Sequence, residues 1–479
     1  VLIIGGGPSG LLLSQLLSDI NIDCLVLEKH TKEHVLSRIR AGVLEEGTIK
    51  LLKKAGIFKR IKDEGFSHDG IFLSLKNRGF RMDFKKLINQ KVTVYGQTEV
   101  TKDLYELREK NNGKVFNSVK DVKIHEIETS SPYVTCKIVD KETKINADFI
   151  IGCDGFHGVS RNTIPKEKIK TFERVYPFAW LGILSETPPI SEELIYANHK
   201  TGFALASMRN ENLSRYYIQT SIDEKTNEWS DDRFWNEIKK RLPEESLENL
   251  VTGPSIEKSL APLRSFVVEP MSYGNLFLVG DAAHLTPPFM GQGMCAGIRD
   301  ASNLAWKISI CCKKGHNEKL LDTYQSERSS NVRDYINTAM KMGELLNSIG
   351  GSKVSDTVYM EKDGTIKMNS IKPKLGKGLG NLHDKNRGKI FPYVKINFDK
   401  EFDDLFSCYP ILITNNKKSE KKFKIRTYSS IDIPEIETIL KKFNSNSLII
   451  RPDRFVLAST DKSDLRDFSR FYLNQFLAS

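Results

Sequence analysis

The chain begins Val1-Leu2-Ile3-Ile4-Gly5-Gly6-Gly7-Pro8-Ser9-Gly10 and continues with Leu11-Leu12-Leu13. The first four apolar residues are typical of a buried strand, the glycines of a tight turn, and the leucines of a helix. The spacing of Gly5, Gly7 and Gly10 lets backbone N–H groups approach a pyrophosphate at a helix N-terminus, where the helix dipole favours negative charge. Because such a turn alone is weak evidence, the residues that follow the helix decide its meaning.

A carboxylate follows the next predicted strand. The apolar run Cys24–Leu27 ends at Glu28, which lies 18 positions after Gly10. This spacing is expected of a carboxylate that accepts hydrogen bonds from a ribose in a dinucleotide-binding βαβ unit. The sequence therefore predicts an α/β fold in which a parallel sheet binds a dinucleotide.

Two aspartates follow further predicted strands. Ala147–Ile151 leads to Asp154-Gly155, and Asn275–Val279 leads to Gly280-Asp281. A cofactor bound at a parallel sheet is contacted at the carboxyl ends of the strands, where these residues are predicted to lie. Taken singly, each aspartate is equally well explained as a helix cap.

Length and composition narrow the class of protein. The 479 residues suffice for about two to three domains, and 72 Lys and Arg against 61 Asp and Glu give a net charge of +11. These charges are dispersed, which favours small anionic partners over nucleic acid. No run of about 18 uncharged apolar residues predicts a membrane span. Seven cysteines without a C-x-x-C pair indicate a reducing cytoplasm, with neither a disulfide framework nor a metal site.

Together these motifs resemble the flavin-dependent aromatic hydroxylases, the single-component FAD monooxygenases. The stretches Ser37–Glu45, Val94–Thr101, Phe172–Phe178 and Ser259–Phe266 resemble the 4-hydroxybenzoate branch of this family. The resemblance implies a Rossmann-like FAD-binding domain interleaved with a β-sheet substrate domain. It also implies non-covalent FAD and NAD(P)H as co-substrate.

The resemblance assigns cofactor roles to residues along most of the chain. It implies that Glu28 holds the adenosine ribose and Asp281 the ribityl chain, whereas Arg215 faces the flavin. The positions assigned to FAD are Gly5, Gly7, Gly10, Glu28, Arg40, Gln97, Asp154, Gly155, Arg215, Gly280, Asp281, Gly293 and Met294. The positions assigned to NAD(P)H are Arg38, His157, Arg161 and Arg264. An isolated arginine among these is equally explained as a solvated surface charge.

The segment from Tyr196 to Tyr217 alternates polar and apolar residues, as a strand with one polar face does. By resemblance, Arg209 binds the substrate carboxylate, and Ser207 and Tyr217 add hydrogen bonds. The catalytic positions implied are Tyr196, which polarises the phenol, Pro288, which closes the pocket with its carbonyl, and His68, at the outer end of a proton path. Without the resemblance, the same pattern describes a sheet that faces solvent.

After Pro288 the sequence resembles the phenol and 3-(3-hydroxyphenyl)propionate hydroxylase branch. We expect an FAD-binding domain over 1–350 with an interleaved substrate sheet (about 70–100 and 172–270), a connecting segment over 351–402 and a thioredoxin-like domain over 403–479. Periodicity predicts a long helix over 320–346 and no regular structure over 350–390. In the C-terminal part we expect a strand over 410–413, a helix over 434–443, a strand pair around 447–457 and a last helix.

The resemblance implies hydroxylation of a phenolic acid with NAD(P)H and O2, most directly of 4-hydroxybenzoate to 3,4-dihydroxybenzoate. One alternative is another phenolic substrate such as 3-(3-hydroxyphenyl)propionate, since the sequence changes beyond Pro288. A second alternative is an FAD-binding reductase that does not hydroxylate. A homodimer, the choice between NADH and NADPH and the second relay tyrosine of the 4-hydroxybenzoate branch stay open.

Overall fold

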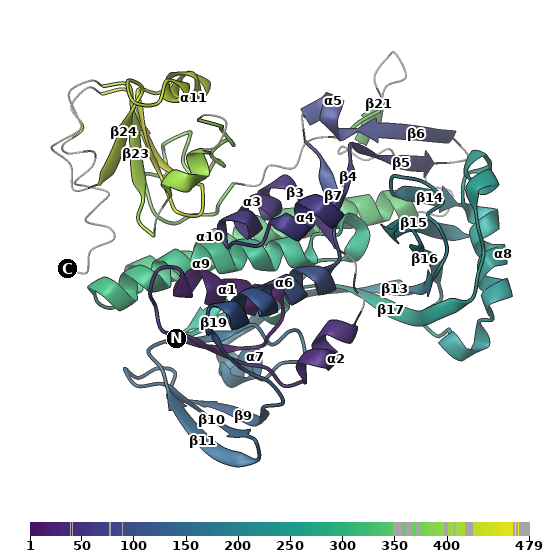
Figure 1. Ribbon diagram of the computed structural model, residues 1–479, viewed down its shortest axis with the longest axis horizontal. Coiled ribbons are helices and arrows are strands. Elements are labelled where there is room, and N and C mark those ends of the chain that lie inside the picture. Colours follow the sequence, from purple (N-terminus) through teal and green to yellow (C-terminus); the bar gives the residue numbers. More distant parts are fainter. Residues whose placement is uncertain are drawn as a thin grey trace.

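The parallel sheet begun by the opening motif lies beside the marked N-terminus in the computed structural model (Figure 1). The structure describes residues 1–38, 40, 42–75, 78–88, 90–347, 358–360, 366–368, 374–396, 401–406, 408–416, 425–462, 465 and 468. The strand order is β18-β19-β12-β1-β2-β8, and every neighbouring pair is parallel except β18 with β19. The strands are β1 (Leu2–Ile4), β2 (Leu25–Leu27), β8 (Lys114–Phe116), β12 (Ile150–Gly152), β18 (Ser272–Tyr273) and β19 (Leu276–Leu278).

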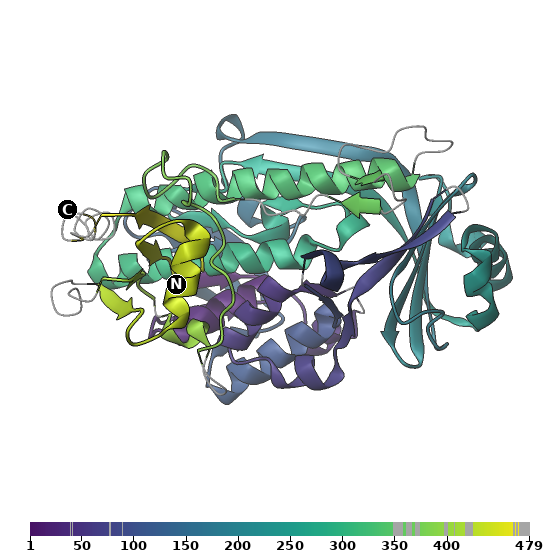
Figure 2. The ribbon, with the colours of Figure 1, turned by 90° about the horizontal axis from the view of Figure 1, so that it is seen from above.

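Four helices pack around this sheet. They are α1 (Pro8–Ser18), α6 (Gln97–Lys110), α9 (Gly293–Lys314) and α10 (Glu318–Asn347). Pro8 occupies the first turn of α1, where its missing N–H costs nothing, and all the leucines of α1 except Leu16 are fully buried. Figure 2 shows α10 running along the molecule, which confirms the long helix predicted over 320–346.

A second, eight-stranded sheet follows the order β20-β17-β13-β16-β15-β14-β5-β6. Its strands are β5 (Gly70–Leu75), β6 (Arg78–Asp83), β13 (Lys170–Ser185), β14 (Ile195–His199), β15 (Gly202–Asn210), β16 (Leu213–Thr220), β17 (Ser255–Glu269) and β20 (His284–Leu285). One face packs on α8 (Asp231–Arg241) through apolar side chains such as Ala206 and Tyr216. The next residues along the strands, such as Ser207 and Tyr217, therefore lie on the opposite face.

Smaller elements complete the described part of the chain. One antiparallel sheet contains β9 (Lys120–His125), β10 (Tyr133–Ile138) and β11 (Lys141–Asn146), and another contains β3 (Val43–Glu45), β4 (Phe66–His68) and β7 (Val92–Val94). The short helices are α2 (Lys32–Ser37), α3 (Glu46–Lys54), α4 (Lys59–Glu64), α5 (Phe84–Ile88) and α7 (Ser160–Thr163). The absence of regular structure expected over 350–390 is wrong in part, because β21 (Val358–Met360) and β22 (Ile366–Met368) form a hairpin there.

The C-terminal unit is a four-stranded sheet with one helix. Its order is β24-β23-β25-β26, formed by β23 (Ile411–Thr414), β24 (Arg426–Ser429), β25 (Ser447–Ile450) and β26 (Val456–Thr460). Helix α11 (Glu435–Phe443) follows Pro434 and buries Ile436, Ile439 and Leu440 against this sheet. These elements confirm the predicted strands and helix, whereas the predicted last helix and most of 351–373 lie outside the described residues.

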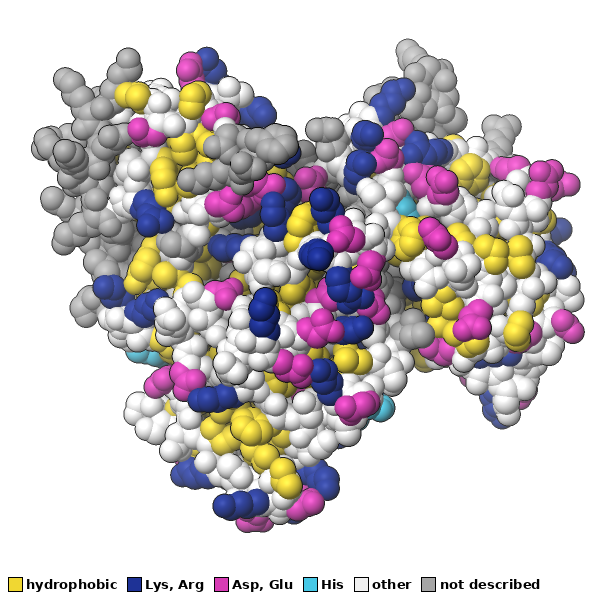
Figure 3. Space-filling view, in the orientation of Figure 1, with side chains coloured by type: hydrophobic (Ala, Val, Ile, Leu, Met, Phe, Trp, Pro, Cys, Tyr) yellow, Lys and Arg dark blue, Asp and Glu magenta, His cyan; other side chains and the backbone are white. Residues whose placement is uncertain are grey.

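Positive and negative side chains are interspersed over the face shown in Figure 3, with no large area of one sign. This agrees with the dispersed charge of the sequence. None of the helices in the described ranges has the length and apolar character that crossing a bilayer requires.

Candidate functional site

The glycine turn lies at the carboxyl end of β1, at the N-terminus of α1. A Cβ on Gly5 would lie 2.2 Å from the Cys153 carbonyl oxygen, and a Cβ on Gly10 would lie 2.1 Å from the Gly5 carbonyl oxygen, so both positions need glycine for close packing. A Cβ on Gly7 would meet nothing within 4 Å. The first turn of α1 has no side-chain cap and no acidic residue. Its N–H groups are therefore free to bind an anionic ligand.

Glu28 ends β2 beside this turn. Its carboxylate accepts hydrogen bonds from the backbone N–H groups of Gly6 (2.6 Å) and His30 (2.8 Å), and its side chain is buried. These bonds fix the carboxylate next to the glycine turn, and each oxygen keeps an acceptor position for a ribose hydroxyl.

The two other predicted aspartates have different surroundings. Asp281 follows β19 in the turn Gly280–His284. Its side chain is exposed, although the protein atoms packed around it partly desolvate the carboxyl and raise its pKa. It is thus accessible to a ligand. Asp154 accepts hydrogen bonds from the N–H and the hydroxyl of Ser160, both at 2.9 Å, and so caps α7 as the alternative interpretation expected. Its other carboxylate oxygen is buried without a partner.

The remaining residues assigned to FAD come from several elements. A Cβ on Gly96 would lie 3.8 Å from the Arg40 carbonyl oxygen, which places exposed Arg40 beside Gln97 at the start of α6. Burial raises the pKa of Asp281, and the charge of Arg40 partly opposes this rise, so these two charges face the same region. Gly293 and Met294 begin α9, whose first turn has neither a side-chain cap nor an acidic residue. A Cβ on Gly293 or Gly155 would meet nothing within 4 Å.

Two helix N-termini, the buried Glu28 carboxylate beside the glycine turn, and an accessible aspartate with a nearby arginine fit FAD. The helix ends offer N–H groups to anionic portions of the cofactor, and the carboxylates of Glu28 and Asp281 offer acceptors to its hydroxyl groups.

The residues assigned to NAD(P)H do not form one group. Arg161 donates to the carbonyl oxygens of Ala282 (3.0 Å) and Phe156, so it braces the turn that carries Asp281. Arg264 pairs with Glu173 at 2.9 Å and lies over the Phe156 ring, beside exposed His157.

The fourth NAD(P)H residue lies on another segment. Exposed Arg38 ends α2, and its carbonyl oxygen accepts a hydrogen bond from Thr98 of α6 at 2.6 Å.

The residues assigned to the substrate share one face of the eight-stranded sheet. Tyr196 of β14 lies opposite Leu205 of β15, which in turn lies opposite Tyr217 of β16. Ser207 and Arg215 form the next pair on this face, and Arg209 follows Ser207 by two residues. The placement results from the period of two along each strand.

Two guanidinium groups lie close together on this face. Arg209 donates to the Ser207 hydroxyl at 2.7 Å, and its Nε is buried without a partner. Arg215 donates to the Tyr217 hydroxyl at 3.2 Å and pairs with Glu257 at 2.8 Å. Because Glu257 balances only one of the two positive charges, the cluster is suited to an anionic ligand at Arg209.

Tyr196 lies in an aromatic part of the same face. Its side chain is buried, which raises the pKa of its hydroxyl to about 12. The Trp180 ring stacks on Phe203 with centroids 4.7 Å apart, and the Tyr196 and Phe203 centroids are 6.1 Å apart. Tyr196 is therefore a protonated hydrogen-bond donor at neutral pH in a water-poor environment.

Two catalytic assignments have surroundings that differ from the expectation. The Pro288 carbonyl accepts a hydrogen bond from Gly291 N–H at 3.0 Å, and its side chain is exposed. His68, expected at the outer end of a proton path, is buried with Nε2 at 3.2 Å from the Met208 sulfur, and burial lowers its pKa.

Sequence reasoning missed Phe289 and Asp300. Phe289 is fully buried, with its ring centroid 5.4 Å from those of Tyr176 and Trp180, so it belongs to the aromatic cluster on this face of the sheet. Asp300 of α9 accepts hydrogen bonds from Gly280 N–H (3.0 Å) and His284 Nε2 (2.6 Å) and so fixes the turn that carries Asp281. The sequence signal that could have identified Asp300 is its position three residues after Gly297, about one turn further along α9.

The comparisons with known proteins agree with this geometry. Residues 1–339 match the family model described as FAD binding domain. The p-hydroxybenzoate hydroxylase of Acinetobacter baylyi is 48% identical over 328 residues, which are 68% of this chain and 81% of that protein. The chain belongs to the FAD-binding family of flavin-dependent aromatic hydroxylases.

More distant members of the flavin-dependent hydroxylases match a larger share of the chain. The probable NADH-specific resorcinol 4-hydroxylase of Rhodococcus jostii is 25% identical over 383 residues, 72% of this chain and 65% of that protein. The crystal structure of aklavinone-11 hydroxylase with FAD and aklavinone has a TM-score of 0.77 at 18% identity and covers 99% of this chain and 98% of that one. At that identity the likeness concerns the fold, and it extends over the C-terminal unit.

Proposed function

We propose that the chain hydroxylates 4-hydroxybenzoate to 3,4-dihydroxybenzoate with NAD(P)H and O2. The observation that carries this proposal is the shared sheet face with Arg209 and buried Tyr196, because it offers a cation to a carboxylate and a donor to a phenol. The 48% identity to p-hydroxybenzoate hydroxylase supports the same substrate.

When bound and reduced by NAD(P)H, FAD supplies the oxygen-activating chemistry. The protein's own residues then orient the ring and adjust its charge. Arg209 binds the carboxylate, with the Ser207 and Tyr217 hydroxyls beside it. Tyr196 donates a hydrogen bond to the phenol oxygen, which favours the phenolate and makes the ring more electron-rich. Trp180, Phe203 and Phe289 keep water from the ring.

The test is a turnover assay with product identification. The purified protein is incubated with NADH or NADPH and O2, and with 4-hydroxybenzoate, resorcinol or 3-(3-hydroxyphenyl)propionate in parallel. We expect 3,4-dihydroxybenzoate from the first acid at the highest rate. Product from another phenol alone would assign the other substrate, and oxidation of NAD(P)H without any ring product would identify a reductase.

We further predict that FAD is held without a covalent link. His284 and Cys153, which lie near the cofactor turns, are poor candidates to bond the ring: His284 is buried against Asp300, and burial raises the pKa of the Cys153 thiol well above its usual value. Acid precipitation of the yellow protein should release all the flavin into the supernatant. Colour that stays in the pellet after washing would contradict this prediction.

We infer that 403–479 is a thioredoxin-like domain without redox activity, following an FAD-binding and substrate part over 1–350 and a connecting segment over 351–402. The order β24-β23-β25-β26, with only β23 and β24 parallel and α11 joining β24 to β25, supports the inference. The described residues of this unit include one cysteine, Cys408. We expect the unit to serve in packing or dimer contacts.

A further inference from the structure

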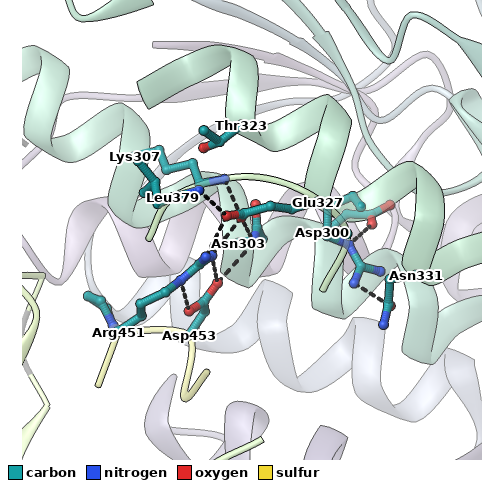
Figure 4. A network of polar contacts seen from close by, with 12 residues as sticks. Asp300, Asn303, Lys307, Thr323, Glu327, Asn331, Leu379, Arg451 and Asp453 are labelled. Carbon is teal, nitrogen blue, oxygen red and sulfur yellow. Dashed lines mark hydrogen bonds and ion pairs between the residues drawn. The ribbon is translucent and has the colours of Figure 1, made fainter. Parts of the chain in front are cut away.

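Arg451 of the C-terminal unit reaches into the interface between α9 and α10 (Figure 4). Its guanidinium donates two hydrogen bonds to Glu327 of α10, at 2.6 and 2.8 Å, and two to Asp453, at 2.6 and 2.9 Å. Lys307 and Asn303 of α9 also donate to Glu327, at 2.7 and 3.1 Å. A residue far along the chain thus links the two helices.

The charges of this cluster balance only when Arg451 is present. Lys307 and Arg451 are positive, Glu327 and Asp453 are negative, and all four side chains are buried. Without Arg451, the Asp453 carboxylate would be a buried charge without a cation, which is strongly unfavourable. The C-terminal unit therefore supplies one of the charges that hold α9 and α10 together.

The next residue of α10 extends the connection toward the flavin turn. Arg328, fully buried, donates through Nε to Asp300 of α9 at 2.7 Å. Asp300 in turn accepts hydrogen bonds from Gly280 N–H and His284 Nε2, at 3.0 and 2.6 Å. Despite burial, which alone would raise it, the pKa of Asp300 is held well below its usual range by His284 and Arg328.

We propose that Arg451 is a positioning residue for the flavin-binding turn Gly280–His284. Arg451 fixes Glu327, and adjacent Arg328 on the same rigid helix then holds Asp300 against the turn. The C-terminal unit thereby increases the affinity of the hydroxylase for FAD. This inference depends on FAD binding by the family and not on which phenol is the substrate.

The test is a double-mutant cycle on the full-length chain, with the dissociation constant of FAD as the readout. Arg451→Met should raise this constant about tenfold, as couplings transmitted through packed helices do. Asp300→Asn should raise it roughly 10-fold to 100-fold, because Gly280 and His284 lose a charged acceptor. The double variant should lie within about threefold of Asp300→Asn, since both changes interrupt the same connection.

Lys54→Met is the matched control. Lys54 of α3 donates to the Pro452 carbonyl at 3.3 Å, so it ties the same unit to the FAD-binding part through α3 and not through α9 or α10. The Lys54→Met substitution should lower the melting temperature of the protein and leave its FAD dissociation constant unchanged.

Two results would overturn the proposal. The first is an Arg451→Met protein that, like the control, loses thermal stability but binds FAD as tightly as the parent. The second is a double variant whose FAD dissociation constant rises by the product of the single effects. Should Arg451→Met fail to fold, Arg451→Lys takes its place in the cycle, since it keeps the charge but loses the two-pronged contact with Glu327.

Discussion

The Tyr196→Phe variant should oxidise NAD(P)H when substrate is added but form little hydroxylated product. Hydride transfer from the nicotinamide does not need the Tyr196 hydroxyl, whereas ring attack needs the phenolate that this hydroxyl favours. Product formed per NAD(P)H oxidised should fall by about 10²-fold to 10⁴-fold, the range for losing an acid–base group. The NAD(P)H oxidation that gives no hydroxylated product should instead give hydrogen peroxide.

Tyr216→Phe is the matched control for this measurement. Tyr216 lies on β16 and is as deeply buried as Tyr196, but it faces α8 and packs against Trp235 with centroids 5.0 Å apart. Its removal should leave the product yield unchanged. Because burial raises the pKa of Tyr196 to about 12, the parent yield should show no loss from Tyr196 ionisation up to about pH 10. An undiminished yield in Tyr196→Phe would remove Tyr196 from ring activation.

The Arg209→Ala variant should lose substrate affinity while keeping its flavin. Arg209 has a buried Nε without a partner and pairs with no acidic residue in the part of the chain that the structure describes, so we expect the substrate carboxylate to be its counter-ion. Truncating one partner of a buried charge pair costs about 2–5 kcal/mol, which is roughly a 30-fold to several-thousand-fold increase in the substrate dissociation constant. The substrate dissociation constant is measured by titrating the protein with 4-hydroxybenzoate and following the flavin absorbance.

Arg233→Ala controls for a general loss of positive charge. Arg233 is an exposed residue of α8, on the far side of the sheet, and should leave the substrate dissociation constant as it is. An Arg209→Ala protein that binds the acid as tightly as the parent would show that Arg209 does not bind the carboxylate. Unequal FAD content between the two proteins would instead point to a damaged fold.

Local patterns were enough to predict the cofactor-binding elements. The strand–turn–helix of residues 1–17 and the carboxylate at Glu28 depend on contacts within one βαβ unit, where periodicity and glycine spacing carry the information. The alternation from Tyr196 to Tyr217 also identified which side chains share a sheet face, since a strand repeats every two residues.

Contacts between distant segments were not predictable in the same way. No local pattern shows that the carbonyl of Pro288 is bound within its own turn or that Phe289 fills the adjacent space. The same holds for Arg451, whose partner Glu327 is 124 positions away along the chain. Arg161 was assigned to NAD(P)H by resemblance to the family, whereas no local pattern indicates its bond to the Ala282 carbonyl.

The order of strands in the parallel sheet affects how the chain folds during its synthesis. Ile3 of β1 pairs with Ile151 of β12, which lies 148 positions further along the chain, and Ile151 in turn pairs with Phe277 of β19. The sheet therefore stays incomplete until the segment that contains Phe277 has been synthesised, and such long-range pairing is slow. Until then the apolar edge of β12 is unpaired, and an unpaired strand edge favours aggregation of the incomplete chain.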